Sequence, residues 1–324
     1  MEISVVDQSP IFTNTNADQA IRDSVELAQY SDQIGLKRFW LAEHHGSSSF
    51  AGCSPEILIP RIASSTKNIR VGSGGVMLMH YSPYKVAENF RLLESMFPRR
   101  IDLGLGRAPG SDPFQAGALA YGSKTTGPEF FPTKMNDLRS FLSNQTSETK
   151  SFENVNVTPG LGDVPDTWLL VSSEQGADYA SFFGLPMSLA YFINQDCLHL
   201  AKPYRENFQK SIFGDSPQVS VAVFAICAET NEEANLLASS ASIWRENVSK
   251  GIFGPFPTLE EATKKIKDKD KEEGKSIVGD QKYVEGQLMK ILEETNADEL
   301  KIITICESMS SKKESYRLIK EIFS

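Results

Sequence analysis

Apolar runs of strand length alternate with amphipathic runs of helix length along most of the chain. Strand-like runs occupy residues 2–8, 37–43, 68–78, 101–106, 167–173, 186–193, 218–228 and 299–306. Helix-like patterns occupy residues 18–34, 55–62, 83–97, 174–183, 199–212, 232–248, 283–292 and 316–323. Eight consecutive steps from strand to helix in a chain of this length predict an α/β fold of the (β/α)8 TIM-barrel type.

Two segments interrupt this alternation. Residues 108–166, after the fourth strand, are rich in Gly, Pro, Ser and Thr and contain one predicted helix at 134–142. Residues 251–274, near the seventh strand, form a second insertion, and the charged run at 260–275 is expected to be a solvated, mobile surface element. We expect residues 1–324 to form one barrel domain with these insertions.

A doubly wound parallel sheet is the competing architecture. That fold normally carries a glycine-rich fingerprint after its first strand, whereas the turn DQSPIFTNTN at 7–16 has no glycine. The motif IDLGLGRAPG at 101–110 supplies Gly104 and Gly106, but Pro109 takes the place of the third glycine of a dinucleotide loop. We therefore prefer the barrel and expect its chemistry at the carboxyl ends of the strands.

Composition and charge narrow the class of function. Hydrophobic residues make up 40% of the 324 residues and charged residues 23%, which is typical of a globular protein. The net charge of −9 argues against nucleic acid or an anionic membrane surface as a partner. The four widely spaced cysteines fit a reducing cytoplasm, and no metal-binding motif occurs. The first residues resemble neither a signal peptide nor a membrane anchor, so we expect a cytoplasmic protein.

The second strand ends in LAEHHGSS, which places Glu43, His44 and His45 at the predicted catalytic rim. Successive strand residues point in opposite directions, so the three side chains cannot share one metal while the strand continues. A histidine here suits acid–base chemistry or polarisation of a flavin, because its pKa is near neutrality. A hydrogen-bonded structural trio at the start of a loop is an equal alternative.

Three further strand ends carry candidate ligand groups. The glycine-rich segment GSGG at 72–75 marks either barrel curvature or the close approach of a flat ligand. Arg107 is a candidate phosphate ligand or the member of a surface ion pair. The fifth strand ends in VSSEQGAD, where Ser172, Ser173 and Gly176 form either an anion site or an ordinary helix N-cap. After the sixth strand, Tyr191 and Phe192 stack on a ring or fill the barrel.

Several motifs in a fixed order resemble the bacterial luciferase-like flavin monooxygenases, particularly the single-chain branch. They are WLAEHH, RVGSGGVML, KVAENFRLLESMFPRRIDLGLGRAPG, SSEQGADYASFFGLPMSLAYFIN and IVG followed by NADEL. The resemblance implies a (β/α)8 barrel that binds reduced FMN, forms a C4a-peroxyflavin with oxygen and oxidises a small organic substrate. It also implies a homodimer and a separate NAD(P)H:flavin reductase that supplies the reduced FMN.

The resemblance assigns roles to individual positions. His44 matches the catalytic histidine, Glu43 the residue that contacts the isoalloxazine, and Gly74–Gly75 a non-prolyl cis peptide against the flavin ring. The phosphate-binding positions match Arg107, Ser172, Ser173 and Gly176. Tyr191 replaces the tryptophan beside the ring in luciferase. Gly106 replaces the reactive cysteine of luciferase, so flavin-dependent oxygenation is implied more strongly than light emission.

Two alternative functions are known among proteins related to this fold. A deazaflavin F420-dependent dehydrogenase would use the same barrel with another cofactor, and a non-catalytic flavin-binding protein would lack part of it. A protein that binds no flavin would place the segments of Arg107 and Ser173 apart. The sequence does not identify the substrate. The residues that determine substrate specificity are expected in the two insertions, where the resemblance is weak.

Overall fold

The computed structural model describes residues 1–107, 112–143, 145–147, 149–160, 162–266 and 276–324. Within these ranges the strands are β1 Glu2–Asp7, β2 Arg38–Leu41, β3 Arg70–Met77, β4 Ile101–Gly106, β5 Asp166–Val171, β6 Met187–Ala190, β7 Val219–Ala228, β8 Ser276–Asp280 and β9 Glu299–Ile303. The α-helices are α1 Ala17–Gln33, α2 Pro55–Ala63, α3 Pro83–Met96, α4 Pro113–Ala120, α5 Phe131–Ser143, α6 Glu174–Phe183, α7 Ala201–Asn207, α8 Asn231–Ser249, α9 Leu259–Ile266, α10 Gln281–Thr295 and α11 Met309–Ile322. Short 3-10 helices are η1 Leu78–His80, η2 Pro128–Phe130, η3 Lys150–Phe152 and η4 Gln195–Leu200.

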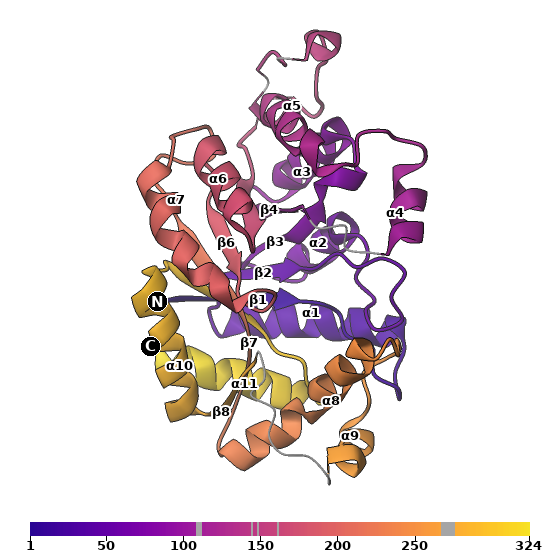
Figure 1. Ribbon diagram of the computed structural model, residues 1–324, viewed down its shortest axis with the longest axis vertical. Helices are drawn as coiled ribbons and strands as arrows, with labels where there is room; N and C mark the ends of the chain where they lie inside the picture. Colours follow the sequence, from indigo (N-terminus) through magenta and orange to yellow (C-terminus); the bar gives the residue numbers. More distant parts are fainter. Residues whose placement is uncertain (108–111, 144, 148, 161, 267–275) are drawn as a thin grey trace.

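The strands form a closed parallel barrel. Strands β1 to β6 pair in chain order, β6 pairs with β7, β7 pairs with β9, and β9 pairs with β1. The helices surround the strands, and Figure 1 shows both chain ends on one side of the molecule. The eight-stranded barrel predicted from the sequence is confirmed for the described residues.

Strand β8 is an element that the sequence analysis missed. Residues 276–280 pair with Phe224–Ala228 of β7, whereas β9 pairs with Ser220–Phe224 of the same strand. Strand β7 is ten residues long, so its first half can pair with β9 and its second half with β8. The segment SIVGD offers only two strongly apolar residues, so its strand character comes from pairing with β7 rather than from a local pattern.

The helices differ from the prediction in several places. Helix α4 lies in the first insertion, where Asp112 caps it by accepting hydrogen bonds from the N–H groups of Phe114 and Gln115. The predicted helix 199–212 ends at Asn207 in α7, and α11 begins at Met309, seven residues before the predicted start. Of the charged run 260–275, residues up to 266 belong to α9 and the rest lie outside the described residues.

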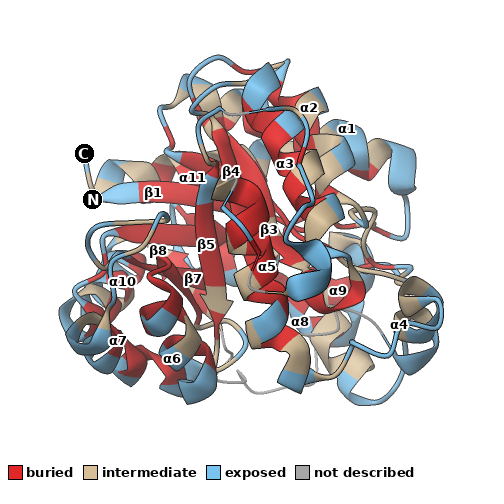
Figure 2. Cartoon of the chain, turned by 90° about the horizontal axis from the view of Figure 1, so that it is seen from above, coloured by how far each residue is buried: buried red, intermediate tan, exposed pale blue. Residues whose placement is uncertain are grey.

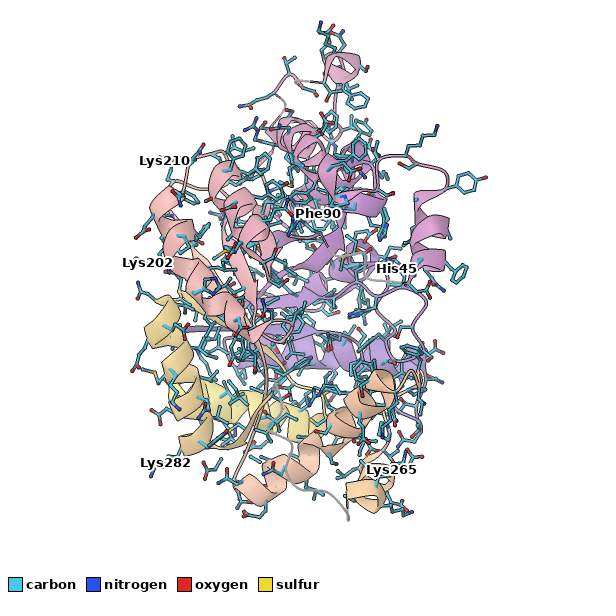
Figure 3. All side chains as sticks on the ribbon, viewed as in Figure 1. His45, Phe90, Lys202, Lys210, Lys265 and Lys282 are labelled. Carbon is cyan, nitrogen blue, oxygen red and sulfur yellow. The ribbon has the colours of Figure 1, made fainter. Side chains whose placement is uncertain are left out.

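Buried side chains form one layer outside the barrel and another inside it. Val5 and Phe39 pack toward the helices, whereas Val6 and Trp40, the next residues in each strand, belong to the inner cluster. Figure 2 shows the strands buried and the outer helix faces exposed. In Figure 3, Phe90 lies inside, while the labelled lysines of the outer helices and loops project from the surface.

An ion network closes the barrel at the amino ends of the strands. Arg38 of β2 donates to Asp102 of β4 and Glu299 of β9, both at 2.9 Å. Lys301, fully buried, lies 4.1 and 4.0 Å from the ring centroids of Trp40 and Trp168. Burial lowers the pKa of Lys301 to about 8. This end is filled, which leaves the opposite, carboxyl-terminal end for a ligand.

Glycine 104 permits the close approach of β3 and β4. A Cβ at this position would lie 2.1 Å from the carbonyl oxygen of Ser73. We expect Gly104→Ala to lower the free energy of unfolding by about 2–3 kcal/mol, because the strands must separate to admit the methyl group.

Urea denaturation measures this effect, and Gly286→Ala in α10 is the matched control. A Cβ at Gly286 has no atom within 4 Å, so this change should stabilise the helix by about 0.5–1 kcal/mol. Equal effects of the two substitutions would contradict the packing argument.

Candidate active site

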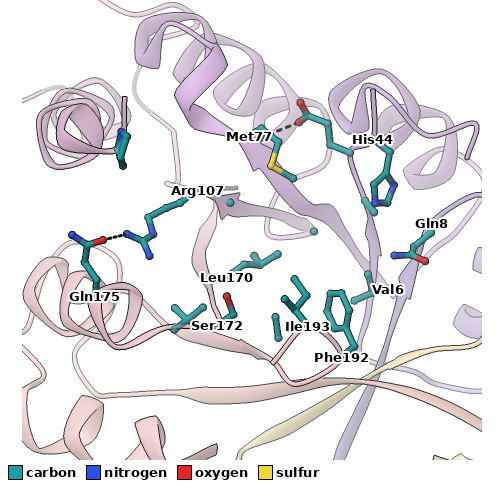
Figure 4. A pocket seen from close by; sticks show the side chains of 17 residues that line it. Val6, Gln8, His44, Met77, Arg107, Leu170, Ser172, Gln175, Phe192 and Ile193 are labelled. Atoms are coloured by element: carbon teal, nitrogen blue, oxygen red, sulfur yellow. Dashed lines mark hydrogen bonds between the residues drawn. The ribbon is translucent and has the colours of Figure 1, made fainter. Parts of the chain in front are cut away.

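A cavity of about 490 Å³ opens at the carboxyl ends of the barrel strands. Its wall includes β1, β3, β4, β5 and β6 and the segments that follow β1, β2 and β4 to β6 (Figure 4). The predicted site residues Glu43, His44, Gly74, Arg107 and Ser172 line it. The predicted residues thus share one cavity at the carboxyl-terminal end of the barrel, and their functional roles stay predictions.

One end of the cavity carries an arginine beside the N-terminus of α6. Arg107, directly after β4, donates from Nη2 to Ser173 Oγ at 2.9 Å and from Nη1 to Gln175 Oε1 at 2.8 Å. Ser173 caps α6 by accepting a hydrogen bond from the N–H of Gly176. The segments of Arg107 and Ser173 thus meet, contrary to what was expected of a protein that binds no flavin.

The surroundings of Arg107 leave its positive charge available to an anionic ligand. Among the described residues no carboxylate forms an ion pair with Arg107, and its guanidinium lies 5.8 Å from the Phe131 ring centroid and 5.4 Å from that of Tyr179. Burial lowers the pKa of Arg107, so its charge is partly desolvated. A phosphate would supply the missing negative charge and would also face the N-terminus of α6.

Ser173 and Gly176 support this end without lining the cavity, whereas Ser172 and Gln175 line it. A Cβ at Gly176 would lie 3.6 Å from Nη2 of Arg107 and 3.1 Å from Val171, so the small residue leaves room for the guanidinium. The sequence analysis missed Gln175. The sequence could have indicated it, because Gln175 lies in the first turn of the helix that Ser173 was expected to cap.

The three residues of the Glu43–His44–His45 motif separate into two groups. The buried Glu43 carboxylate accepts hydrogen bonds from Met77 N–H at 3.1 Å and from Tyr81 Oη at 2.7 Å, and it lies 2.7 Å from His45 Nε2. Burial and the bond to Glu43 raise the pKa of Tyr81. Glu43 and His45 thus join the end of β2 to β3, a structural function that leaves His44 outside the hydrogen-bonded group.

His44 presents a polar atom without a described hydrogen-bond partner. Its ring stacks on Phe50, with centroids 4.3 Å apart and planes inclined by 23°. Nδ1 is buried and has no partner in the described part of the chain. Burial, reinforced by the neighbouring His45, lowers the pKa of His44 to about 4. The imidazole is therefore neutral at physiological pH and can donate one proton or accept one.

The lowered pKa of His44 predicts a pH-dependent loss of stability. The unfolded chain protonates this histidine near pH 6.5, whereas the folded protein does so only near pH 4. The contribution of His44 to stability is thus present above pH 6.5 and falls by up to about 3 kcal/mol as the pH drops to 4. Removing the imidazole removes this dependence.

Urea denaturation at pH 7 and pH 4 tests this prediction with His44→Leu, and His199→Leu, at an exposed position, is the control. Relative to His44→Leu, the wild type should lose up to about 3 kcal/mol of unfolding free energy between pH 7 and pH 4. A constant difference would show that the folded protein does not depress the pKa of His44.

The glycine cluster of β3 packs closely on β4 and borders the cavity, and its contact with a flat ligand stays a prediction. The Gly74–Gly75 peptide bond is cis, as the family resemblance implies. Gly74 lines the cavity, and its Cβ would lie 3.0 Å from the Cβ of Trp40. A Cβ at Gly75, outside the lining, would lie 2.8 Å from the carbonyl oxygen of Gly104. Strand packing therefore restricts Gly75, while Gly74 presents backbone rather than a side chain to the cavity.

Tyr191 is not among the residues that line the cavity. Ala190 and Phe192, its neighbours on either side, are lining residues, and Tyr191 packs against the outer core cluster. Its predicted position beside a flavin ring stays a prediction, while Phe192 contributes an aromatic ring to the cavity wall. Strand β6 ends at Ala190, and in the turn that follows Phe192 donates its N–H to Ala222 O at 3.2 Å.

The fold and this site define a TIM barrel with a cationic end and a histidine in one cavity. The family model of luciferase-like monooxygenases matches residues 1–295, and the chain belongs to that family. An uncharacterised Bacillus subtilis protein, YwcH, is 39% identical over 331 residues, covering 100% of this chain and 99% of YwcH. The N-acetyl-S-alkylcysteine monooxygenase of the same organism is 37% identical over 235 residues, covering 72% of this chain and 70% of that protein.

Solved structures share the same architecture. The crystal structure of apo-MsnO8 has a TM-score of 0.91 at 34% identity and covers 99% of this chain and 98% of its own. The oxygenating constituent of 3,6-diketocamphane monooxygenase from Pseudomonas putida, solved with FMN, has a TM-score of 0.73 at 19% identity, with coverage of 98% and 96%. An F420-dependent secondary alcohol dehydrogenase has a TM-score of 0.64 at 11% identity, with coverage of 98% for both chains. The last two show the fold alone.

None of the described helices has both the length and the apolar composition needed to span a membrane. Within the same residues, no group of three or more His, Cys, Asp or Glu side chains is arranged to hold a metal ion.

Proposed function

We propose that the protein is an FMN-dependent monooxygenase that uses reduced flavin and O2 to oxidise a small organic substrate. The observation that carries the proposal is the combination, in one cavity, of the Arg107–Ser173 anion site with the wall of Gly74 and His44. A phosphorylated, flat cofactor matches a cavity with a cationic end and a wall free of side chains at Gly74. The 37% identity to a named monooxygenase supports the same class of reaction.

The residues fit FMN chemically. Arg107, Ser173, Gln175 and the N-terminus of α6 would hold the phosphate, and Ser172 would line its approach. Bound reduced FMN supplies the electrons that activate O2, a reaction that protein side chains cannot perform. The neutral imidazole of His44 would hold or transfer a proton at Nδ1, its buried atom without a described partner. The apolar lining formed by Val6, Leu170 and Phe192 would exclude water.

A separate NAD(P)H:flavin reductase would supply the reduced cofactor. Arg107 is the only lysine or arginine among the described residues that line the cavity, which suits one phosphate group rather than two bound nucleotides. NAD(P)H oxidation would then take place on another protein. A homodimer and a cytoplasmic location remain predictions from the sequence.

The cofactor distinguishes this proposal from its alternatives. An F420-dependent dehydrogenase shares the fold but transfers hydride without consuming O2, and a non-catalytic flavoprotein would not need His44 in the wall. Mixing the purified protein and reduced FMN with oxygenated buffer tests the proposal in a stopped-flow spectrometer. We expect the protein to change the rate and spectral course of flavin reoxidation, and identical traces with and without protein would overturn the proposal.

A further inference from the structure

The cavity has a second polar region that the flavin assignment does not use. Gln8 follows β1 and lines the cavity, yet only 8% of its surface is exposed. Its side-chain amide forms no hydrogen bond with another described residue. The adjacent Asp7 carboxylate, in contrast, is bound by Ser9 Oγ at 3.2 Å and Ser24 Oγ at 2.5 Å. The described part of the fold therefore leaves the donor and acceptor of the Gln8 amide free to bind a ligand in the cavity.

Gln8 and His44 lie on neighbouring parts of the same wall. Strands β1 and β2 pair with Asp7 opposite Leu41, and the next residue, Ala42, donates its N–H to Asp7 O at 2.9 Å. Both side chains therefore extend from the carboxyl edges of adjacent strands. Figure 4 shows Gln8 beside His44 and away from Arg107 and Gln175. The two polar groups thus lie at the end of the cavity remote from the anion site.

This remote end is uncharged and otherwise apolar. Val6 and Phe192 provide its apolar surface (Figure 4). His44 is neutral, because burial lowers its pKa to about 4. The Glu43 carboxylate is the nearest acidic group of the lining, and three partners already engage it. A charged substrate would find no counter-ion here, whereas a neutral one would find the donor and the acceptor of a primary amide.

We propose that Gln8 determines substrate specificity by hydrogen-bonding a neutral, mostly apolar substrate through an amide or carbonyl group next to its reacting atom. This inference rests on the proposed function, since it takes the anion-binding end to be filled by FMN. The amide of Gln8 offers an N–H donor and a C=O acceptor at one edge, which is the complement of another amide. A cavity whose amide must form hydrogen bonds to the substrate binds analogues without a matching donor or acceptor more weakly.

Ligand titrations of the FMN-loaded protein test this assignment. The probes are N-pentylacetamide, a neutral amide, and heptanoate, an anion of similar length, and the readout is the absorbance change of bound FMN. We expect wild type to bind the amide more tightly than heptanoate. Gln8→Leu, similar in size, should weaken amide binding by about 10- to 100-fold and leave FMN affinity within about twofold. Gln8→Glu, which keeps the shape, should also weaken it.

The control is Gln29→Leu on the exposed face of α1, where the side chain makes one long bond of 3.4 Å to Ser65 O. It should change neither affinity. Unchanged amide binding in both Gln8 variants would overturn the assignment, as would a wild type that prefers heptanoate. A parallel loss of FMN affinity in the Gln8 variants would place Gln8 against the cofactor instead. Failure of the wild-type protein to bind FMN at all would overturn the proposed function itself.

Discussion

Arg107→Ala is expected to weaken FMN binding by about 10- to 100-fold, because a charge-assisted hydrogen bond to phosphate contributes about 1.5–3 kcal/mol. Riboflavin, which has no phosphate, should bind wild type and variant with similar affinity. The selectivity of the wild-type protein for FMN over riboflavin should therefore nearly disappear. Quenching of flavin fluorescence on titration with protein measures all four dissociation constants.

The matched control is Arg22→Ala on α1, where the guanidinium bonds to Gln19 on the exposed helix surface. This variant should retain the selectivity of the wild type. Arg107→Lys should recover only part of it, because a lysine cannot bind Ser173, Gln175 and phosphate through one planar fork. Equal losses of FMN and riboflavin affinity in Arg107→Ala would place the phosphate elsewhere.

His44→Ala is expected to reduce the rate of substrate oxidation by about 100- to 10,000-fold, the usual contribution of general acid–base catalysis. FMN affinity should remain within a few-fold of the wild-type value, since the phosphate end of the cavity is unchanged. The assay follows substrate-dependent oxygen consumption in the presence of a flavin reductase and NADH, together with the fluorescence titration.

A second histidine provides the control for this prediction. His199→Ala, in the exposed part of η4, should leave both the rate and the FMN affinity unchanged. Addition of imidazole should restore part of the activity to His44→Ala if the missing group is a proton carrier. Lost FMN affinity with normal turnover of the bound fraction would assign His44 to cofactor binding rather than to catalysis.

Much of the site could be predicted because barrel geometry brings strand ends together. Arg107 and Ser173 are 66 residues apart in the sequence, yet each follows a strand, and β4 pairs with β5. The rule that chemistry gathers at the carboxyl ends of barrel strands placed both on the same rim. Gln8 satisfies the same rule after β1, so its position was also accessible from the sequence.

The remaining features depend on tertiary contacts. The sequence shows that Glu43 follows β2, but only the structure shows that Met77 and Tyr81 occupy its carboxylate. Tyr191 and Phe192 are equally aromatic, and the turn after β6, where Phe192 N–H bonds to Ala222 O, decides which of them faces the cavity. Strand β8 likewise forms through its pairing with the second half of β7.

A crystal structure of the protein soaked with FMN tests the central claim most directly. We expect the phosphate to contact Arg107, Ser173 and the N-terminus of α6, with the ring system against the Gly74–Gly75 peptide and the remote end beside Gln8 and His44 left for substrate. Density for FMN at another surface, or a phosphate remote from Arg107 within the cavity, would contradict the account.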